Sequence, residues 1–276
     1  MATLVAADRG NPRLDPGNAY ATWLHPTRVA RAILLLHGFT NNPRQFAVLG
    51  PELHADGYNV IAPRLPYHGY RDRMTDALAL MRANDVLACA LDAVILAAQI
   101  GDCVDVLGLS LAGTVVAWLA QRVAIRHALA VAPFFGVAHL NGFFNDGVTL
   151  AVDHLPNAFV WWDPVHREAQ RPPHAYPRFA THALGESLLI SEAVRRSPHA
   201  LCAQRLTFVL NPGDPVVNNG LARACAARMR TRGGNVEVII ATGFPPRHDV
   251  IEPTLPDPPM QTVYPLIREL LNAGSP

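Results

Sequence analysis

Short apolar runs alternate with longer helix-like segments along most of this chain. The run Ala32–Leu36 is apolar at every position, as expected for a strand that is buried on both faces. Such alternation predicts an α/β fold, in which helices cover both faces of a mostly parallel, doubly wound sheet. The predicted strands are Ala19–Leu24 at an edge, Ala32–Leu36, Tyr58–Ala62, Cys103–Leu107, His127–Ala132, Arg205–Leu210 and Val236–Ala241, and the predicted helices include Pro43–Ala55, Asp72–Ile100, Asn219–Arg232 and Met260–Asn272.

The alternation stops between Pro133 and Ala203, a stretch rich in proline and aromatic residues that shows no clear strand pattern. We interpret residues 134–203 as a helical cap inserted over the strand ends, and residues 1–133 and 204–276 as the core. An ordinary long excursion with its own small core is the alternative. The aromatic residues are Phe134, Phe135, Phe143, Phe144, Phe159, Trp161, Trp162, Tyr176 and Phe179.

The composition excludes several classes of function. The net charge is +1 without a basic run, so nucleic acid is not an expected partner. All 23 basic residues are arginine, which excludes a Schiff-base lysine and a P-loop. Only 16% of the residues are charged, which leaves apolar surface for a core, a cap or a subunit interface; a homodimer is therefore one expectation.

The cysteines and the N-terminus bear on the compartment. Cys89, Cys103, Cys202 and Cys225 lack metal-ligand spacing and are expected to be buried free thiols in a reducing environment, with no metal or organic cofactor. Residues 1–11 lack the pattern of a signal peptide. The longest apolar stretch, residues 86–100, contains an aspartate and is shorter than the roughly 20 residues of a membrane helix. A cytoplasmic location without stable membrane insertion is expected.

The segment Gly108–Gly113 carries the strongest chemical signal. It follows a predicted strand, opens a helix-like run and places Ser110 between small residues. A tight strand-to-helix turn of this kind exposes a nucleophilic hydroxyl at the edge of a sheet, and its glycines permit a strained backbone. Ala112 stands where the pattern G-x-S-x-G has its second glycine.

A serine nucleophile needs a base and a carboxylate that orients the base. Asp214 comes just after the strand-like run ending at Leu210, and His248 follows the run ending at Ala241. Because ligands bind outside the carboxyl ends of parallel strands, both side chains are expected near Ser110.

Two backbone N–H groups are expected to stabilise the oxyanion. Leu111 follows the serine at a helix N-terminus, whose dipole adds partial positive charge. Phe39 is the natural second donor in the loop after the first buried strand, where Gly38 is expected to allow close backbone approach, and His37 is expected to hold this loop.

These motifs together resemble α/β-hydrolase-fold serine hydrolases, nearest to small bacterial carboxylesterases and monoacylglycerol-lipase-like enzymes. The resemblance covers about the whole chain and implies that Ser110 is the nucleophile, Asp214 the acid and His248 the base. It rests on the segments His37–Pro43, Leu65–Gly69, Gly108–Gly113, Gly213–Val217 and His248–Asp249, which occur in the expected order.

The chain departs from the family pattern at two positions. Ala112 is expected to hold the helix slightly further from the strand, and Tyr67 replaces a glycine that is frequent in the family and is expected to reshape the pocket edge. Asp249, next to His248, is expected to be solvated rather than catalytic. The candidate substrate-binding residues are His68, Phe135, Trp161 and Trp162, with a structural role as the alternative for each.

The resulting functional prediction is a hydrolase of small-molecule carboxylic esters with an apolar acyl or aryl group. A thioesterase, a lactonase or a carbon–carbon bond hydrolase would use the same triad. A non-catalytic ligand-binding protein on the same fold is a further alternative, although the intact Ser, Asp and His argue against it.

Overall fold

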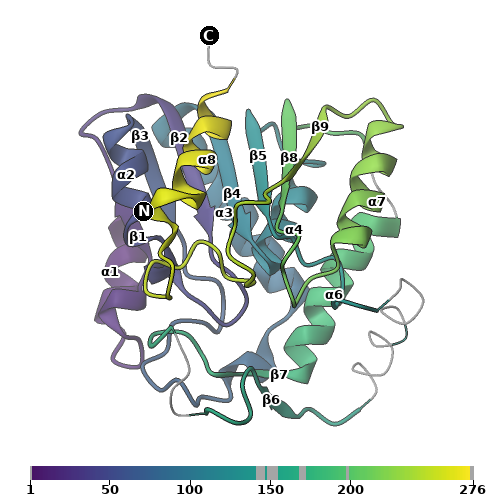
Figure 1. The fold of residues 1–276 in the computed structure, drawn as a ribbon. Coiled ribbons are helices and arrows are strands. Elements are labelled where there is room, and N and C mark those ends of the chain that lie inside the picture. The colour runs from purple at the N-terminus through teal and green to yellow at the C-terminus, as the bar shows by residue number, and fades with distance from the viewer. Residues whose placement is uncertain (1, 141–146, 148–154, 168–171, 197–198, 274–276) are drawn as a thin grey trace.

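A seven-stranded sheet in the order β1-β3-β2-β4-β5-β8-β9 forms the centre of the computed structural model (Figure 1). The edge strand β1 pairs antiparallel with β3, whereas all other neighbours in this sheet are parallel, so the predicted fold class is confirmed. The strands are β1 (Ala21–Trp23), β2 (Val29–Leu36), β3 (Tyr58–Ala62), β4 (Gly101–Leu109), β5 (His127–Val131), β8 (Arg205–Leu210) and β9 (Val236–Ile240). The structure describes residues 2–140, 147, 155–167, 172–196 and 199–273.

Side chains of β2 show how the sheet separates two apolar layers. Ala32, Leu34 and Leu36 pack on one face, and Ile33 and Leu35 pack on the other. Because successive side chains of a strand point to opposite faces, a continuous apolar run is what a two-sided burial requires. The first layer contains α3 (Ala83–Ile100), α4 (Leu111–Leu119), α6 (Thr181–Arg196) and α7 (Asn219–Arg230); the second contains α2 (Leu49–Ala55) and α8 (Val263–Asn272); α1 (Ala2–Gly10) precedes the first strand.

Three predicted helices begin later than the sequence pattern indicates. The one predicted from Met260 begins at Val263, after a short 3₁₀ helix, Pro259–Gln261. The helix predicted from Asp72 begins at Ala83, because a short 3₁₀ helix, Ala77–Leu80, comes first and the backbone is extended at Met81 and Arg82. The helix predicted from Pro43 is divided into a short 3₁₀ helix, Pro43–Phe46, and α2. Asn42 caps the 3₁₀ helix by accepting from Arg44 N.

The region between Pro133 and Ala203 contains two strands that the sequence pattern did not reveal. The strands β6 (Phe159–Trp161) and β7 (Arg178–Ala180) form an antiparallel pair, which Figure 1 shows beyond one end of the main sheet. Each strand has three residues, too short for a recognisable alternating pattern. The helix α6 then packs its buried face against α4 and α3. Phe143 and Phe144 lie outside the described residues.

The helix α3 has the length and apolar composition of a membrane span, and it is the one such helix among the described residues. In this fold its buried residues, Val86, Ala90 and Ala97 among them, pack against the sheet. Length and composition therefore do not distinguish a span from a core helix here.

The four cysteines are free thiols, as predicted, but they are not all buried. Cys225 is buried on α7 and Cys89 is half-buried on α3, whereas Cys103 and Cys202 are exposed. Cys103 lies near the start of β4, where the strand is exposed before it enters the core, and Cys202 lies in the loop before β8. The predicted burial is therefore wrong for these two residues.

Candidate active site

Ser110 occupies a strained turn between β4 and α4. Its φ of 61° and ψ of −120° lie outside the regions that non-glycine residues ordinarily adopt. Backbone hydrogen bonds hold the turn: Ser110 N donates to Val131 O at 3.0 Å, and Phe134 N donates to Ser110 O at 3.0 Å. The strain therefore persists because neighbouring strand ends fix the backbone on both sides of the serine.

Gly108 is the residue that permits the close approach of helix and strand at this turn. A Cβ at Gly108 would lie 2.5 Å from Ala112 O, closer than side-chain atoms come to backbone oxygen. Gly113 is also tightly placed, since a Cβ there would lie 3.0 Å from Pro133 Cα. The wider helix-to-strand spacing expected from Ala112 is thus not found at Gly108; Ala112 is accommodated with no exposed surface.

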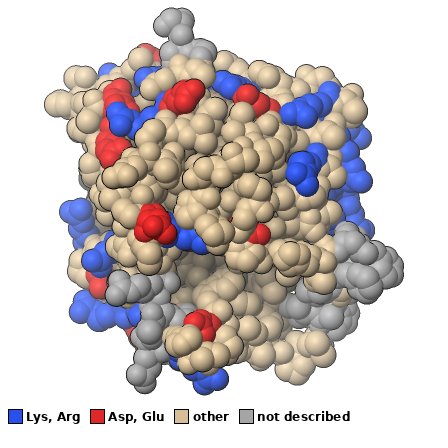
Figure 2. Space-filling view, viewed as in Figure 1, with Lys and Arg blue, Asp and Glu red and all other residues tan. Residues whose placement is uncertain are grey.

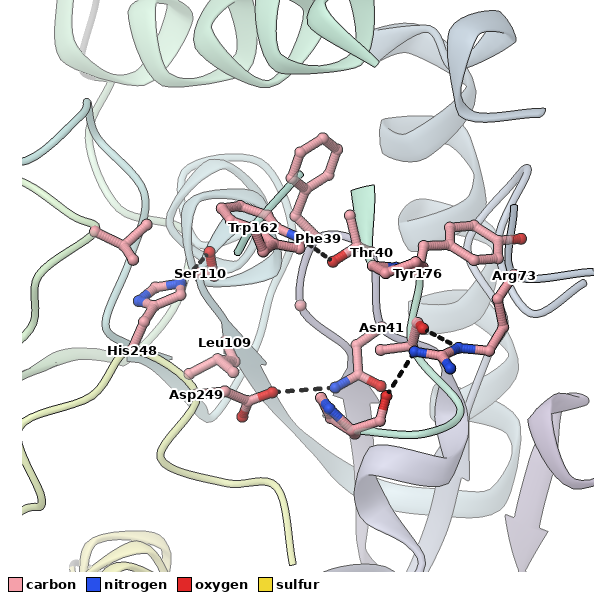
Figure 3. A pocket seen from close by; sticks show the side chains of 15 residues that line it. Phe39, Thr40, Asn41, Arg73, Leu109, Ser110, Trp162, Tyr176, His248 and Asp249 are labelled. Carbon is pink, nitrogen blue, oxygen red and sulfur yellow. Dashed lines mark hydrogen bonds between the residues drawn. The ribbon is translucent and has the colours of Figure 1, made fainter. Parts of the chain in front are cut away.

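The structure brings Ser110, His248 and Asp214 into one hydrogen-bonded chain. His248 Nε2 lies 2.7 Å from Ser110 Oγ, and His248 Nδ1 lies 2.7 Å from Asp214 Oδ2 (Figure 3 shows the first contact). The three residues follow β4, β9 and β8, which places all of them at the carboxyl ends of parallel strands. A serine, an imidazole and a carboxylate in this order can activate the hydroxyl as a nucleophile.

Asp214 is fixed by the backbone of its own loop. Its Oδ1 accepts from Val216 N at 2.8 Å and from Val217 N at 3.2 Å, which leaves Oδ2 for the imidazole. The neighbouring Asn211 side chain donates to the carbonyl oxygens of Pro245 and Arg247, both at 2.8 Å. The loop that carries Asp214 is therefore tied directly to the loop that carries His248.

The loop after β2 is held by His37 and Gln45. Leu65 N donates to His37 Nε2 at 3.0 Å, so the neutral ring carries its proton on Nδ1 and donates to Gly38 O at 3.0 Å. Burial, followed by the effect of His68, lowers the pKa of His37 well below its usual value and keeps the ring neutral. A Cβ at Gly38 would meet Leu109 Cδ2 at an ordinary 3.5 Å, so the expected need for a glycine there is not evident.

Asp249 is half-buried in the pocket wall and hydrogen-bonded, rather than solvated as expected. Its Oδ2 accepts from Gln45 Nε2 at 2.8 Å and from Asn41 Nδ2 at 3.1 Å. Its Oδ1 accepts from Glu252 N at 3.2 Å. Burial, reinforced by the nearby Glu252 carboxylate, raises the pKa of Asp249 to about 6. The expectation of a solvated residue was wrong because its amide partners lie 204 and 208 positions away in the chain.

A pocket of about 170 Å³ opens beside Ser110 and His248. Figure 2 shows this face of the molecule hollowed between the sheet-bearing part and the part that carries β6 and β7. Trp162 forms part of the wall, and its Nε1 donates to Thr40 Oγ1 at 3.0 Å (Figure 3). The lining is mostly apolar, with polar groups from Thr40, Asn41, Arg73 and Asp249.

A second, much smaller cavity of about 20 Å³ lies on another side of Ser110. Phe39 and Trp162 line both cavities, their rings meeting edge to face with centroids 6.3 Å apart. Leu111 and Leu184 also line the small cavity. Of the residues that the structure describes, those lining this cavity do not include His248. Ser110 is thus reached from two unequal compartments.

Of the four candidate substrate-binding residues, Trp162 is the one placed in the pocket wall. Phe135 has no exposed surface and packs against the Phe208 ring at 5.7 Å. His68 is fully buried, with Nδ1 2.8 Å from Pro66 O, and burial lowers its pKa to about 4. Trp161 lies under the Arg167 guanidinium at 5.1 Å. Phe135, His68 and Trp161 do not line the pocket, so their positions do not support the expected contact with substrate.

Several pocket residues were missed from the sequence. Thr40 and Asn41 directly follow the predicted oxyanion loop, so the strand-end rule could have identified them. Arg73 and Tyr176 come from segments without a motif, and their side chains reach the pocket through the fold alone. Tyr67, at the position of a family glycine, has a φ of 67°, a conformation that glycine adopts more easily.

The donor set at this site does not resemble a metal centre. Within the part of the chain that the structure describes, no group of three or more His, Cys, Asp or Glu residues is arranged to hold a metal ion.

Residues 33–260 match the model of the Alpha/beta hydrolase family, and the chain therefore belongs to that family. The match includes the turn at Ser110 and the loops that carry Asp214 and His248. No curated protein matches the chain.

Solved structures share the fold at low sequence identity. A soluble variant of monoglyceride lipase from Saccharomyces cerevisiae is 13% identical, with a TM-score of 0.68, and the match covers 92% of this chain and 90% of that chain. Paleococcus ferrophilus monoacylglycerol lipase is 16% identical, with a TM-score of 0.67 and coverages of 93% and 98%. A structure described with LipS and LipT, two metagenome-derived lipolytic enzymes, is 18% identical, with a TM-score of 0.63 and coverages of 86% and 91%.

Proposed function

We propose that this protein is a carboxylic-ester hydrolase that works through an acyl-enzyme on Ser110. The observation that carries the proposal is the chain of two 2.7 Å contacts from Ser110 Oγ through the His248 ring to Asp214. A backbone strained at the serine, at the edge of a parallel sheet, supports the same role.

The reaction follows from these positions. His248 Nε2 accepts the proton of Ser110 as its Oγ attacks the ester carbonyl carbon, and the carbonyl electrons move to oxygen. The N–H groups of Phe39 and Leu111 are the proposed donors to this oxyanion; losing one such donor typically costs about 3 kcal/mol of barrier. His248 then protonates the leaving alcohol, and water releases the acid by the same steps. Asp214 holds the imidazole tautomer and stabilises the imidazolium.

The two cavities suggest how the ester is oriented. Because His248 must protonate the leaving oxygen, the alcohol side of the ester belongs in the larger pocket, which His248 lines. The acyl side is left with the small cavity beside Leu111, whose volume of about 20 Å³ admits a group the size of a water molecule or a methyl. We therefore expect the shortest acyl groups, acetyl above all, and larger alcohols.

A rate profile with p-nitrophenyl esters of graded acyl length tests the activity. Wild type should hydrolyse the acetate faster than esters of longer acids, and Ser110→Ala should lose the activity by about 10³-fold or more. Equal rates for the two proteins would refute the nucleophile assignment and favour a non-catalytic binding role.

A matched pair of leucines on α6 tests the acyl compartment. Leu184 lines the small cavity, whereas Leu189 is exposed on the same helix. Leu184→Ala should shift the preference toward longer acyl chains by about tenfold, as one or two methylene groups of extra space allow. Leu189→Ala should leave the profile unchanged, and an unchanged profile in Leu184→Ala would place the acyl group elsewhere.

A further inference from the structure

Asp249 connects the loop of His248 to the loop of Phe39. It is adjacent to His248 in the chain, but its carboxylate turns toward the segment after β2, where it faces Asn41 (Figure 3). The same Oδ2 atom accepts from Gln45 Nε2 and from Asn41 Nδ2. Two loops that follow different strands are thereby joined at one oxygen atom.

Gln45 relays this contact to the backbone. Its Oε1 accepts from Gly38 N at 3.0 Å, and the side chain is fully buried. A glutamine amide has two faces, one that accepts and one that donates. Because Oε1 accepts from the Gly38 N–H while Nε2 donates to the Asp249 carboxylate, the amide is anchored at both ends; without that carboxylate, its NH₂ end loses this anchor.

The orientation of Gly38 matters because the next peptide carries the Phe39 N–H. Donors to an oxyanion act only when they are held in place before charge develops on the substrate. A small displacement of such a donor is enough to slow the reaction. The backbone turn here is itself tight, since Asn41 N donates to Gly38 O at 3.1 Å and Thr40 has a φ of 65°.

We propose that Asp249 is a positioning residue, which fixes the Gln45 amide and through it the Phe39 N–H that serves the oxyanion. The inference rests on the proposed function, since it assigns a role to Phe39 in that reaction. Asp249 acts through Gln45 and forms no bond with the reacting atoms.

Asp249 lies among polar and ionisable side chains. Its neighbours are His248, the amides of Asn41 and Gln45, and Glu252, which in turn lies 3.2 Å from His174 Nε2. Burial near a second carboxylate disfavours the charge of Asp249 and raises its pKa.

Three variants separate orientation from packing. Asp249→Ala removes the acceptor, Asp249→Asn keeps an amide oxygen that can accept from Gln45, and Gln45→Met keeps the volume without polar atoms. Asp249→Ala and Gln45→Met should each lower kcat about tenfold with KM changed less than about threefold, a fraction of the loss of a whole oxyanion donor. Asp249→Asn should recover most of the rate, and a loss equal to that of the alanine variant would overturn the relay.

The double variant tests whether the two residues act in one chain. Asp249→Ala combined with Gln45→Met should be no slower than the slower single variant within about twofold, because either change breaks the same relay. Effects that multiply to about a hundredfold would show separate roles. Asp257→Asn, an exposed carboxylate of the same loop, is the matched control and should retain the wild-type rate.

A measurement that does not depend on catalysis tests the positioning role separately from the proposed function. Amide hydrogen exchange at Gly38 should be about tenfold faster in Asp249→Ala than in wild type, while exchange in the β4 strand stays the same. Unchanged exchange at Gly38 would overturn the positioning role whether or not the protein hydrolyses esters. Failure of the proposed function would instead appear as wild-type protein that hydrolyses no ester although Gly38 exchange responds to Asp249.

Discussion

Asp214 and Asp249 are both close to His248, yet the fold holds them in different ways. Asp214 receives two backbone N–H groups from its own loop and turns its free oxygen to the imidazole. Asp249 receives side-chain amides from a distant loop and lies near a second carboxylate. These contacts fit the two proposed roles, in which the first carboxylate serves the base and the second positions the loop opposite it.

The largest expected difference between the two is in turnover. Asp214→Asn should lower kcat by about 10³-fold or more, since an amide facing His248 Nδ1 favours the wrong tautomer. Asp249→Asn should retain at least about half of the wild-type rate, because its amide oxygen can still accept from Gln45. Steady-state kinetics on one short-chain ester measures both, and similar losses in the two variants would abolish the distinction.

A smaller effect is expected in the pH dependence of stability. The pKa of Asp249 is raised from 3.8 to about 6 in the folded protein, so between these values the native state binds a proton that the unfolded chain releases. The contribution of this carboxyl to the free energy of unfolding is then full below about pH 4 and falls as the pH rises through 6. The asparagine side chain in Asp249→Asn does not titrate, so this variant does not lose free energy of unfolding in this way as the pH rises.

Thermal unfolding across pH measures the effect. The Tm of Asp249→Asn relative to wild type should rise by about 5 °C between pH 4 and pH 7. Asp257→Asn, whose side chain is exposed, should show no such trend. A Tm difference that is constant across pH would mean that Asp249 titrates as an ordinary surface carboxyl.

The smallest expected effect comes from Glu252. Its negative charge is one of the causes that raise the pKa of Asp249, after burial. Glu252→Gln should therefore lower the pH range over which Asp249 affects the Tm, by less than about one pH unit. The comparison of Tm curves for Glu252→Gln with and without Asp249→Asn checks this, and a window that stays at the same pH would exclude Glu252 as a cause.

The sequence allowed much of the fold and the central chain of three residues to be predicted. Apolar runs mark the strands, and Ser110, Asp214 and His248 each follow such a run, so the parallel sheet itself brings them to one edge. The resemblance to α/β-hydrolase-fold serine hydrolases added the expected order of the motifs along the chain. The hydrogen bonds in the structure then agree with the predicted partners.

The remainder depends on contacts that no local pattern encodes. Asp249 resembles a solvated loop residue until Asn41 and Gln45 are folded against it. The pair β6–β7 joins three-residue strands whose pairing is decided by tertiary packing. The pocket walls likewise combine side chains from separate loops, so their volumes follow only from the packed structure.

Covalent labelling of Ser110 tests the central claim most directly. A fluorophosphonate should add one phosphonyl group to wild-type protein, and peptide mass spectrometry should locate it on Ser110. Ser110→Ala should remain unlabelled, and His248→Ala should label far more slowly although its serine is intact, because the base is missing. Labelling of another residue, or equal labelling of wild type and Ser110→Ala, would contradict the account.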